Sequence, residues 1–178
     1  MATERELEPS LDFKGLYEKH ASDVFRFAMY LSGNRSDAED ITAETFVRAW
    51  TAPQRIEMAT VKGYLFTIAR NVFRKGLRRT SRQTALSEEL PDPALGAPGR
   101  LEQQAELEAV LARLQELPEV DRAALLMRAL DGLPYQEIAQ ALEISVSSAR
   151  VKVHRARAVL MKLRTSVAGA QHGKEGVR

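Results

Sequence analysis

The side chains with the clearest chemistry form a cluster of cations and hydroxyl groups near the C-terminal end of the sequence. Between Ile144 and Arg164 there are six Lys or Arg residues and no acidic residue. Guanidinium, ammonium and hydroxyl groups can reach phosphates or the edges of bases in a DNA groove. The segment therefore indicates nucleic-acid binding, although a basic run by itself is more often the solvated face of a helix.

Two predicted helices would position these groups. Their apolar residues recur at helical spacing, at Ile138, Ala139 and Leu142 and then at Ala149, Val153, Ala156 and Leu160. Ser145 is placed to cap the second helix by accepting a hydrogen bond from a backbone amide one turn ahead. Two short helices, a tight turn and a basic second helix predict a helix-turn-helix that binds DNA.

The face of the second helix opposite its apolar stripe would meet the DNA. On a helical wheel this face carries Ser147, Val151, His154 and Arg155, flanked by further hydroxyl and basic side chains. The residues that we predict to contact DNA are Ser147, Ser148, Arg150, Lys152, His154, Arg155 and Arg157.

A second basic segment lies in the middle of the chain. From Met58 to Ser87 there are seven Lys or Arg residues and no acid, which favours a second phosphate-binding surface. A helix is predicted from about Val61 to Arg79, with Arg70, Arg74 and Arg78 opposite its apolar stripe. The aromatic residues among these cations could stack unpaired bases or pack in the core, and core packing is the more common role at this spacing: Tyr64, Phe66 and Phe73.

Two helices are predicted before this segment. Apolar residues from Phe13 to Leu31 mark one face of the first, which ends near Gly33, and His20 lies in that stripe, where packing is its expected role. Ser36 and Glu39 have capping-box spacing and predict the start of the second. The outer face of this second helix carries Asp37, Asp40, Glu44 and Arg48. Taken alone, these charges are explained by the helix dipole and one surface ion pair.

The chain as a whole reads as all-α, with two small helical domains. Its 178 residues are 44% hydrophobic, enough for a core, and no segment has the alternating pattern of a strand. Residues 80–100 contain three prolines and two glycines, which predicts an extended, flexible linker. We expect a first domain over 1–80, a linker over 81–100, a second domain with the helix-turn-helix over 101–165, and a disordered tail over 166–178.

Composition narrows the functional classes. The sequence has no cysteine, so thiolate metal sites, disulfides and cysteine nucleophiles are excluded. Its net charge is only +2, with an isoelectric point near 9.0. The chain is therefore not basic throughout, and any basic surface must come from a local cluster of cations. We find no phosphate loop or metal-ligand spacing and expect no cofactor, no metal and no catalytic activity. Without an apolar run of membrane-spanning length or a signal peptide, we expect a soluble cytoplasmic protein with no membrane insertion.

Three blocks of sequence stand in order along the chain. The first joins Leu16-Tyr17-Glu18-Lys19-His20 to residues 37–50, the second is residues 64–71, and the third runs from Leu117-Pro118 to Arg157. Together they resemble the bacterial RNA polymerase sigma factors of the small, two-domain, extracytoplasmic-function type. The resemblance implies a specificity subunit that binds core RNA polymerase and promoter DNA and is commonly held inactive by an anti-sigma factor.

The resemblance also implies roles for individual residues. The acidic helix would dock on polymerase through Asp40, Glu44 and Arg48. The third helix and the loop from Pro53 would read and open the minus 10 promoter element, with Lys62, Tyr64, Arg70, Asn71 and Arg74 as candidates, and the helix-turn-helix would read the minus 35 element. The chain departs from the family pattern at Ala43, Lys75 and Glu143. Glycine is usual in the family at the position of Glu143, in the turn of the helix-turn-helix. Glu143 therefore predicts either a strained left-handed residue or a differently built turn.

Two other functions are compatible with parts of the sequence. A free-standing helix-turn-helix regulator would bind an operator as a dimer without polymerase, but the chain has no clear dimerisation helix. A hydrolytic enzyme would need a nucleophile, a histidine pair or a phosphate loop, and the three histidines at positions 20, 154 and 172 are scattered.

Overall fold

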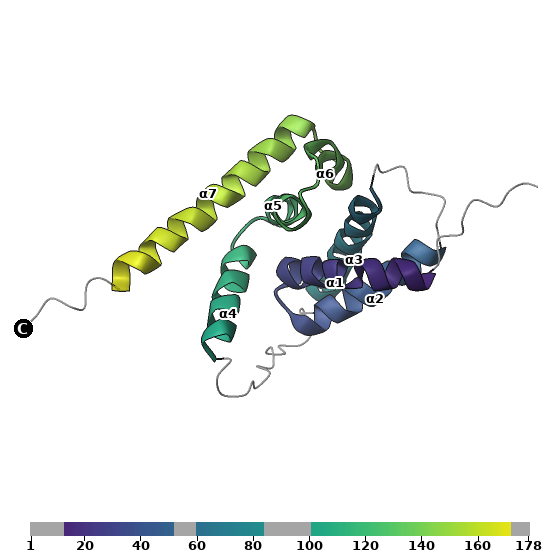
Figure 1. Ribbon diagram of the computed structural model, residues 1–178, viewed down its shortest axis with the longest axis horizontal. Coiled ribbons are helices and arrows are strands. Elements are labelled where there is room, and N and C mark those ends of the chain that lie inside the picture. Colours follow the sequence, from purple (N-terminus) through teal and green to yellow (C-terminus); the bar gives the residue numbers. More distant parts are fainter. Residues whose placement is uncertain (1–12, 52–59, 84–100, 172–178) are drawn as a thin grey trace, which may run out of the picture.

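The computed structural model describes residues 13–51, 60–83 and 101–171, and the regular secondary structure within these ranges is entirely helical (Figure 1). The helices are α1 (Phe13–Ser32), α2 (Arg35–Thr51), α3 (Val61–Gln83), α4 (Leu101–Gln115), α5 (Glu119–Asp131), α6 (Tyr135–Leu142) and α7 (Val146–Gln171). The all-α prediction is confirmed. None of these helices is long and apolar enough to cross a membrane.

Helices α1, α2 and α3 pack on one another and form the N-terminal unit (Figure 1). Phe27 of α1 and Phe66 of α3 are fully buried and stack with ring centroids 4.5 Å apart. Burial of one such side chain contributes about 1.5–3 kcal/mol. Phe66 and Phe73 both lie on the buried side of α3. They therefore pack in the core, which is the role that the sequence favoured over stacking with bases.

The junction between α1 and α2 differs in detail from the prediction. Gly33 ends α1 in the left-handed region, with φ of 74°, and its amide donates to the carbonyl oxygen of Met29. The cap of α2 is the side chain of Asn34, whose Oδ1 accepts a hydrogen bond of 3.0 Å from the Asp37 amide. The predicted cap at Ser36 is wrong because Asn34 takes that role two residues earlier, where it satisfies the same kind of free amide.

Helices α4 to α7 form the C-terminal unit, in which α5, α6 and α7 pack together and α4 contacts α5. Helix α6 ends at Glu143, which has φ of 56° and ψ of 45°, and the Ile144 amide donates to the carbonyl oxygen of Ala139. Ser145 then caps α7, since its Oγ accepts a hydrogen bond of 3.1 Å from the Ser148 amide. The predicted helix-turn-helix is confirmed. In its turn Glu143 adopts the left-handed conformation although it is not a glycine.

The two units are packed against each other. Helix α1 contacts α4 and α5, and α3 contacts α5 and α6, so that buried residues of both units belong to one hydrophobic cluster. The predicted linker is helical at residues 81–83, and its remainder lies outside the described residues. Helix α7 continues to Gln171, so the first six residues of the predicted tail, 166–171, are helical.

Candidate nucleic-acid and partner interfaces

One face of α7 is buried and the opposite face is open. The inner stripe of α7 consists of Ala149, Val153 and Ala156, all essentially inaccessible to solvent. The outer face exposes Ser147, Arg150, Val151, His154 and Arg155, with Arg157 also exposed. His154, Arg155 and Arg157 make no hydrogen bond or ion pair with any residue that the structure describes. Their donors are therefore available to phosphates or base edges.

Arg150 is held in place by an aromatic ring. The guanidinium groups of Arg128 and Arg150 lie 5.0 and 5.6 Å from the ring centroid of Tyr135, the first residue of α6. Cation–π contacts of this kind contribute about 0.5–1 kcal/mol at exposed sites. The contact fixes the Arg150 side chain at the junction of the two helices, and Arg150 remains exposed on the predicted DNA face.

Lys152 differs from its neighbours on α7. Its Nζ lies 2.9 Å from Oδ1 of Asp121 in α5, a carboxylate that is 2% exposed. A buried carboxylate needs a partner because desolvation penalises its charge. Lys152 therefore joins α7 to α5. The prediction that it contacts DNA did not anticipate this pairing, which draws its charge away from the exposed face.

Arg70 of α3 is buried between the two units. Its Nε and Nη2 donate hydrogen bonds of 2.7 and 3.1 Å to the two carboxylate oxygens of Glu119 in α5. Its Nη1 also approaches the carbonyl oxygen of Ala141 in α6, at 3.5 Å. The prediction placed Arg70 opposite the apolar stripe, on a phosphate-binding surface. In the structure Arg70 is 3% exposed because the C-terminal unit covers it, whereas Arg78 farther along α3 is exposed.

Lys62 also connects the units. Its Nζ lies 2.7 Å from Oδ2 of Asp23 in α1 and 2.5 Å from Oδ1 of Asp131 in α5. Hydrogen bonds to Asp131 and then to Asp23 raise the pKa of Lys62, and the hydrogen bond from Lys62 lowers the pKa of Asp23. Nearby, Thr60 donates its hydroxyl to Glu137 of α6. Thr60, Lys62 and Arg70 thus each contact an acidic residue of the C-terminal unit.

The remaining minus 10 candidates divide by exposure. Tyr64 is buried in the core, which removes its ring from stacking with bases in this arrangement. Asn71 is exposed and Arg74 is half-buried. The loop that would precede them, residues 52–59, lies outside the described residues. The structure therefore does not bring the five candidates together on one open surface.

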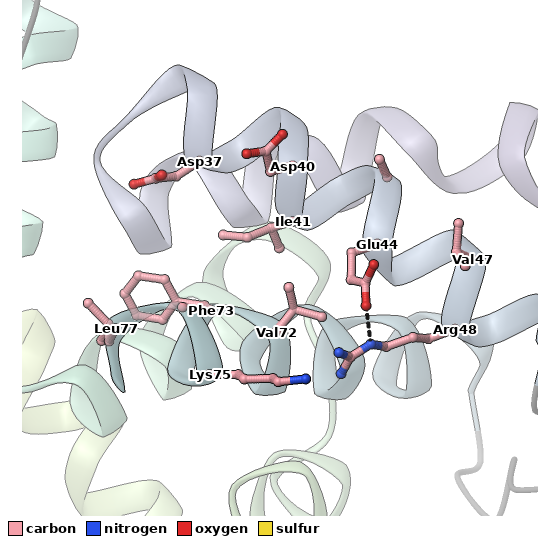
Figure 2. Close-up of a pocket in the computed structure, with 12 residues that line it drawn as sticks. Asp37, Asp40, Ile41, Glu44, Val47, Arg48, Val72, Phe73, Lys75 and Leu77 are labelled. Carbon is pink, nitrogen blue, oxygen red and sulfur yellow. Dashed lines mark hydrogen bonds and ion pairs between the residues drawn. The ribbon is translucent and has the colours of Figure 1, made fainter. Parts of the chain in front are cut away.

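A groove of about 550 Å³ runs between α2 and α3. Figure 2 shows Asp37, Asp40 and Glu44 along α2, with Val72, Lys75 and Leu77 along α3. Glu44 accepts a hydrogen bond of 2.7 Å from Nε of Arg48, an ion pair within one helix (Figure 2). The three predicted docking residues, Asp40, Glu44 and Arg48, line this one groove. Sequence reasoning missed its α3 wall, where exposed Leu77 adds apolar surface.

Sequence comparison identifies two known regions in this chain. The sequence model of Sigma-70 region 2 matches residues 16–83, and that of Sigma-70, region 4 matches residues 107–160. The chain is 31% identical to the ECF RNA polymerase sigma factor SigM of Bacillus subtilis over 153 residues, covering 83% of this chain and 92% of SigM. The chain belongs to the extracytoplasmic-function sigma factors.

Two further similarities place the sigma factor within this family. It is 37% identical to SigE of Mycolicibacterium smegmatis over 150 residues, which cover 80% of this chain and 57% of SigE. It also resembles the sigma factor RpoE of Bartonella quintana, solved in complex with the anti-sigma factor NepR. That match has a TM-score of 0.70 and 26% identity, and it covers 86% of this chain and 97% of RpoE.

The two matched regions correspond to the two packed units of the sigma factor. Region 2 covers nearly all of α1 to α3, and region 4 covers most of α4 to α7. The acids that pair with Lys62 and Arg70 were missed by sequence reasoning. Glu119 and Asp131 stand at the start and end of α5, where they read as ordinary helix-end charges, and no local signal indicates partners in α3.

Proposed function

We propose that this sigma factor binds core RNA polymerase through its N-terminal unit, holds the minus 35 element with α7, and assists opening of the minus 10 element. The observation that carries the proposal is the open face of α7, whose cations and hydroxyls lie opposite a buried stripe in a capped helix-turn-helix. Such a helix presents side chains to the major groove, where sequence can be read.

The groove between α2 and α3 is the proposed docking surface for polymerase. Asp40 and Glu44 are exposed on one wall, and exposed Val47 and Leu77 add apolar surface beside them. An interface commonly joins a small apolar centre to charged groups at its rim, and the charges there select a partner of opposite sign. The matching polymerase surface would be basic at its rim and apolar at its centre.

Binding at the minus 10 element requires a rearrangement of the packed units. Arg70 and Lys62 are engaged by Glu119 and Asp131. A phosphate can reach the buried Arg70 only after α5 moves away, and it can pair with Lys62 only in competition with the carboxylate of Asp131. DNA phosphates offer the same charge as these carboxylates and would replace them as partners. We therefore infer that the packed arrangement precedes promoter binding and that α5 separates from α3 in the complex with polymerase and DNA.

Three further properties belong to the same proposal. The protein acts as an initiation factor without catalytic residues of its own, and it works in the cytoplasm, where polymerase and promoter DNA are found. We also infer an anti-sigma partner, because the RpoE structure to which this chain is similar was solved with the anti-sigma factor NepR.

Titration of the fluorescently labelled protein with core polymerase tests the docking surface. Asp40→Ala removes a charge from the groove and should weaken binding by about tenfold, which corresponds to about 1.4 kcal/mol. Glu39→Ala is the matched control, since Glu39 is an exposed acid on the same helix that pairs with Arg35 and does not line the groove. Equal affinity of the Asp40 variant and wild type would reject this surface as the docking site.

The alternative function, a helix-turn-helix regulator that binds an operator without polymerase, predicts a different result in a gel shift. Tight, sequence-specific binding of duplex DNA by the protein alone would favour that regulator. The proposed function predicts weak binding by the protein alone, because the open face of α7 is only one of its two DNA contacts and the α3 cations Arg70 and Lys62 are engaged by acids. Tight, specific binding should require core polymerase.

A further inference from the structure

Val151 is an exposed apolar residue in the middle of the DNA-facing surface of α7. Val151 is 53% exposed, its neighbours at helical spacing are Ser147, Ser148, His154 and Arg155, and the exposed Arg150 directly precedes it. Residues three and four apart lie side by side on a helix. Val151 therefore stands at the centre of a patch whose other members are hydroxyl, imidazole and guanidinium groups.

Packing within the protein does not account for this valine. Successive residues of a helix are rotated by about 100°, so Val151 points away from Ala149 and Val153, which form the buried stripe. Nor does helix stability account for it, because a β-branched residue in an exposed helical position is less favourable than alanine or lysine. The apolar group is then better explained by what it contacts outside the protein.

The surroundings of Val151 identify a base edge as that contact. A protein partner or a second copy would favour an apolar patch, whereas the neighbours of Val151 are groups that bind phosphates and bases. Lys152 points away toward Asp121, which leaves Val151 as the side chain between Arg150 and His154 on the open face. In the major groove, thymine is the base that presents a methyl group, and apolar side chains contact it.

We propose that Val151 is a specificity-determining residue that contacts the C5 methyl group of a thymine in the upstream promoter element. This inference rests on the proposed function, since it requires α7 to enter the major groove. Arg150 and Arg155 on either side would contact phosphates or purine edges and set the register. Val151 has no hydrogen-bonding group, so its contribution to sequence selection is the burial of two apolar surfaces.

Replacement of thymine by deoxyuridine tests the contact, because the two bases differ by the C5 methyl group alone. Promoters are first located by mapping transcript starts made by core polymerase carrying the full-length protein. Each thymine of the upstream element, on either strand, is then replaced in turn by deoxyuridine, and binding of the polymerase complex is measured by competition. At one position the replacement should weaken binding by about fourfold, the effect of one buried methyl group.

Val151→Ala should abolish the response at that position and leave responses elsewhere unchanged. Val159→Ala is the matched control, since Val159 lies on the same helix and is 36% exposed, and it should retain the wild-type response. A uniform response of the wild type to every replacement, an upstream element without thymine, or an unchanged response of Val151→Ala would overturn the inference. Absence of promoter-specific starts would instead reject the proposed function, and this inference with it.

Discussion

Arg70 of α3 and Glu119 of α5 form a bidentate ion pair across the contact between the two units. The distances are 2.7 and 3.1 Å, and the two side chains are 4% and 20% exposed. The pair joins residues 49 positions apart in the sequence. Because Arg70 cannot contact Glu119 and a DNA phosphate in the same geometry, this ion pair links the arrangement of the units to the accessibility of a predicted DNA-binding residue.

Glu119→Gln should loosen the packing between the units. The substitution leaves the Arg70 guanidinium buried without its charged partner, and an unsatisfied buried group costs about 1–3 kcal/mol. Because the units can move apart, we expect that cost to appear as separation, with a larger radius of gyration in small-angle X-ray scattering. An identical scattering profile for the variant and wild type would show that the pair does not hold the units together.

The control for this experiment is Glu116→Gln. Glu116 pairs with Arg113 on the surface of the same unit, where both side chains are about half exposed, and exposed pairs contribute about 0–1 kcal/mol. The control should therefore leave the scattering profile unchanged.

Lys152 and Arg155 should have separable effects although both are cations of α7. Lys152→Met leaves the buried Asp121 carboxylate without its cation and should lower the free energy of unfolding by about 1–3 kcal/mol. Arg155→Ala removes an exposed group and should leave stability unchanged while reducing the salt slope of promoter binding by about 1. Urea unfolding and salt-dependent binding by the polymerase complex measure the two effects. The assignment fails if Lys152→Met is as stable as wild type.

His20 should make the protein less stable in mild acid. Burial, then Lys19 and Lys62, lowers the pKa of His20 below its ordinary value of 6.5, and Asp23 and Asp131 oppose this. The unfolded chain therefore takes up a proton first as the pH falls below 6.5, and stability declines until the folded pKa is reached. The Asp23 carboxyl has a lowered pKa and stays ionised through that window.

His20→Gln removes this titration, so the loss of unfolding free energy between pH 7 and pH 5 should become smaller in urea unfolding. His154→Gln is the control because His154 is exposed on α7, and it should keep the wild-type pH dependence. If the two variants respond to pH alike, His20 is not the group responsible.

Glu143→Gly should stabilise the turn of the helix-turn-helix. A non-glycine residue in the left-handed region, as Glu143 is with φ of 56°, is strained by about 1–2 kcal/mol. Glycine relieves that strain but costs about 0.4–1 kcal/mol through the entropy of the unfolded chain. The net gain in unfolding free energy should be about 0.5–1 kcal/mol, and Glu143→Val should instead be destabilising. If Glu143→Gly is less stable than wild type, the claim that the backbone is strained at Glu143 is wrong.

The features predicted correctly from the sequence are those set by neighbours along the chain. The Ser145 cap and the buried stripe of α7 depend on residues within two turns of one another. The left-handed conformation of Glu143 was one of two alternatives that the sequence left open. Core packing was the favoured one of two possible roles for Phe66, and the structure buries this side chain fully. The start of α2 was less well determined because Asn34 and Ser36 are both good capping residues, and the structure shows that Asn34 is the one that caps the helix.

The features that sequence alone could not supply depend on distant partners. Lys62, Arg70 and Lys152 are cations in basic segments, and nothing beside them in the sequence indicates that acids of α1 and α5 engage them. Charge patterns show that a group can bind an anion, and they do not show which anion. The groove between α2 and α3 likewise depends on contact between two separate helices. The sequence therefore indicated its α2 residues and not the α3 residues that form the opposite wall.

The most direct test of the central claim is promoter-dependent transcription by core RNA polymerase in vitro. Genomic DNA is transcribed by core polymerase with and without the purified protein, and the 5′ ends of the transcripts are mapped. The protein should produce new starts that share two upstream sequence elements at a constant spacing. Starts that are no more frequent or specific with the protein than with core polymerase alone would contradict its function as a sigma factor.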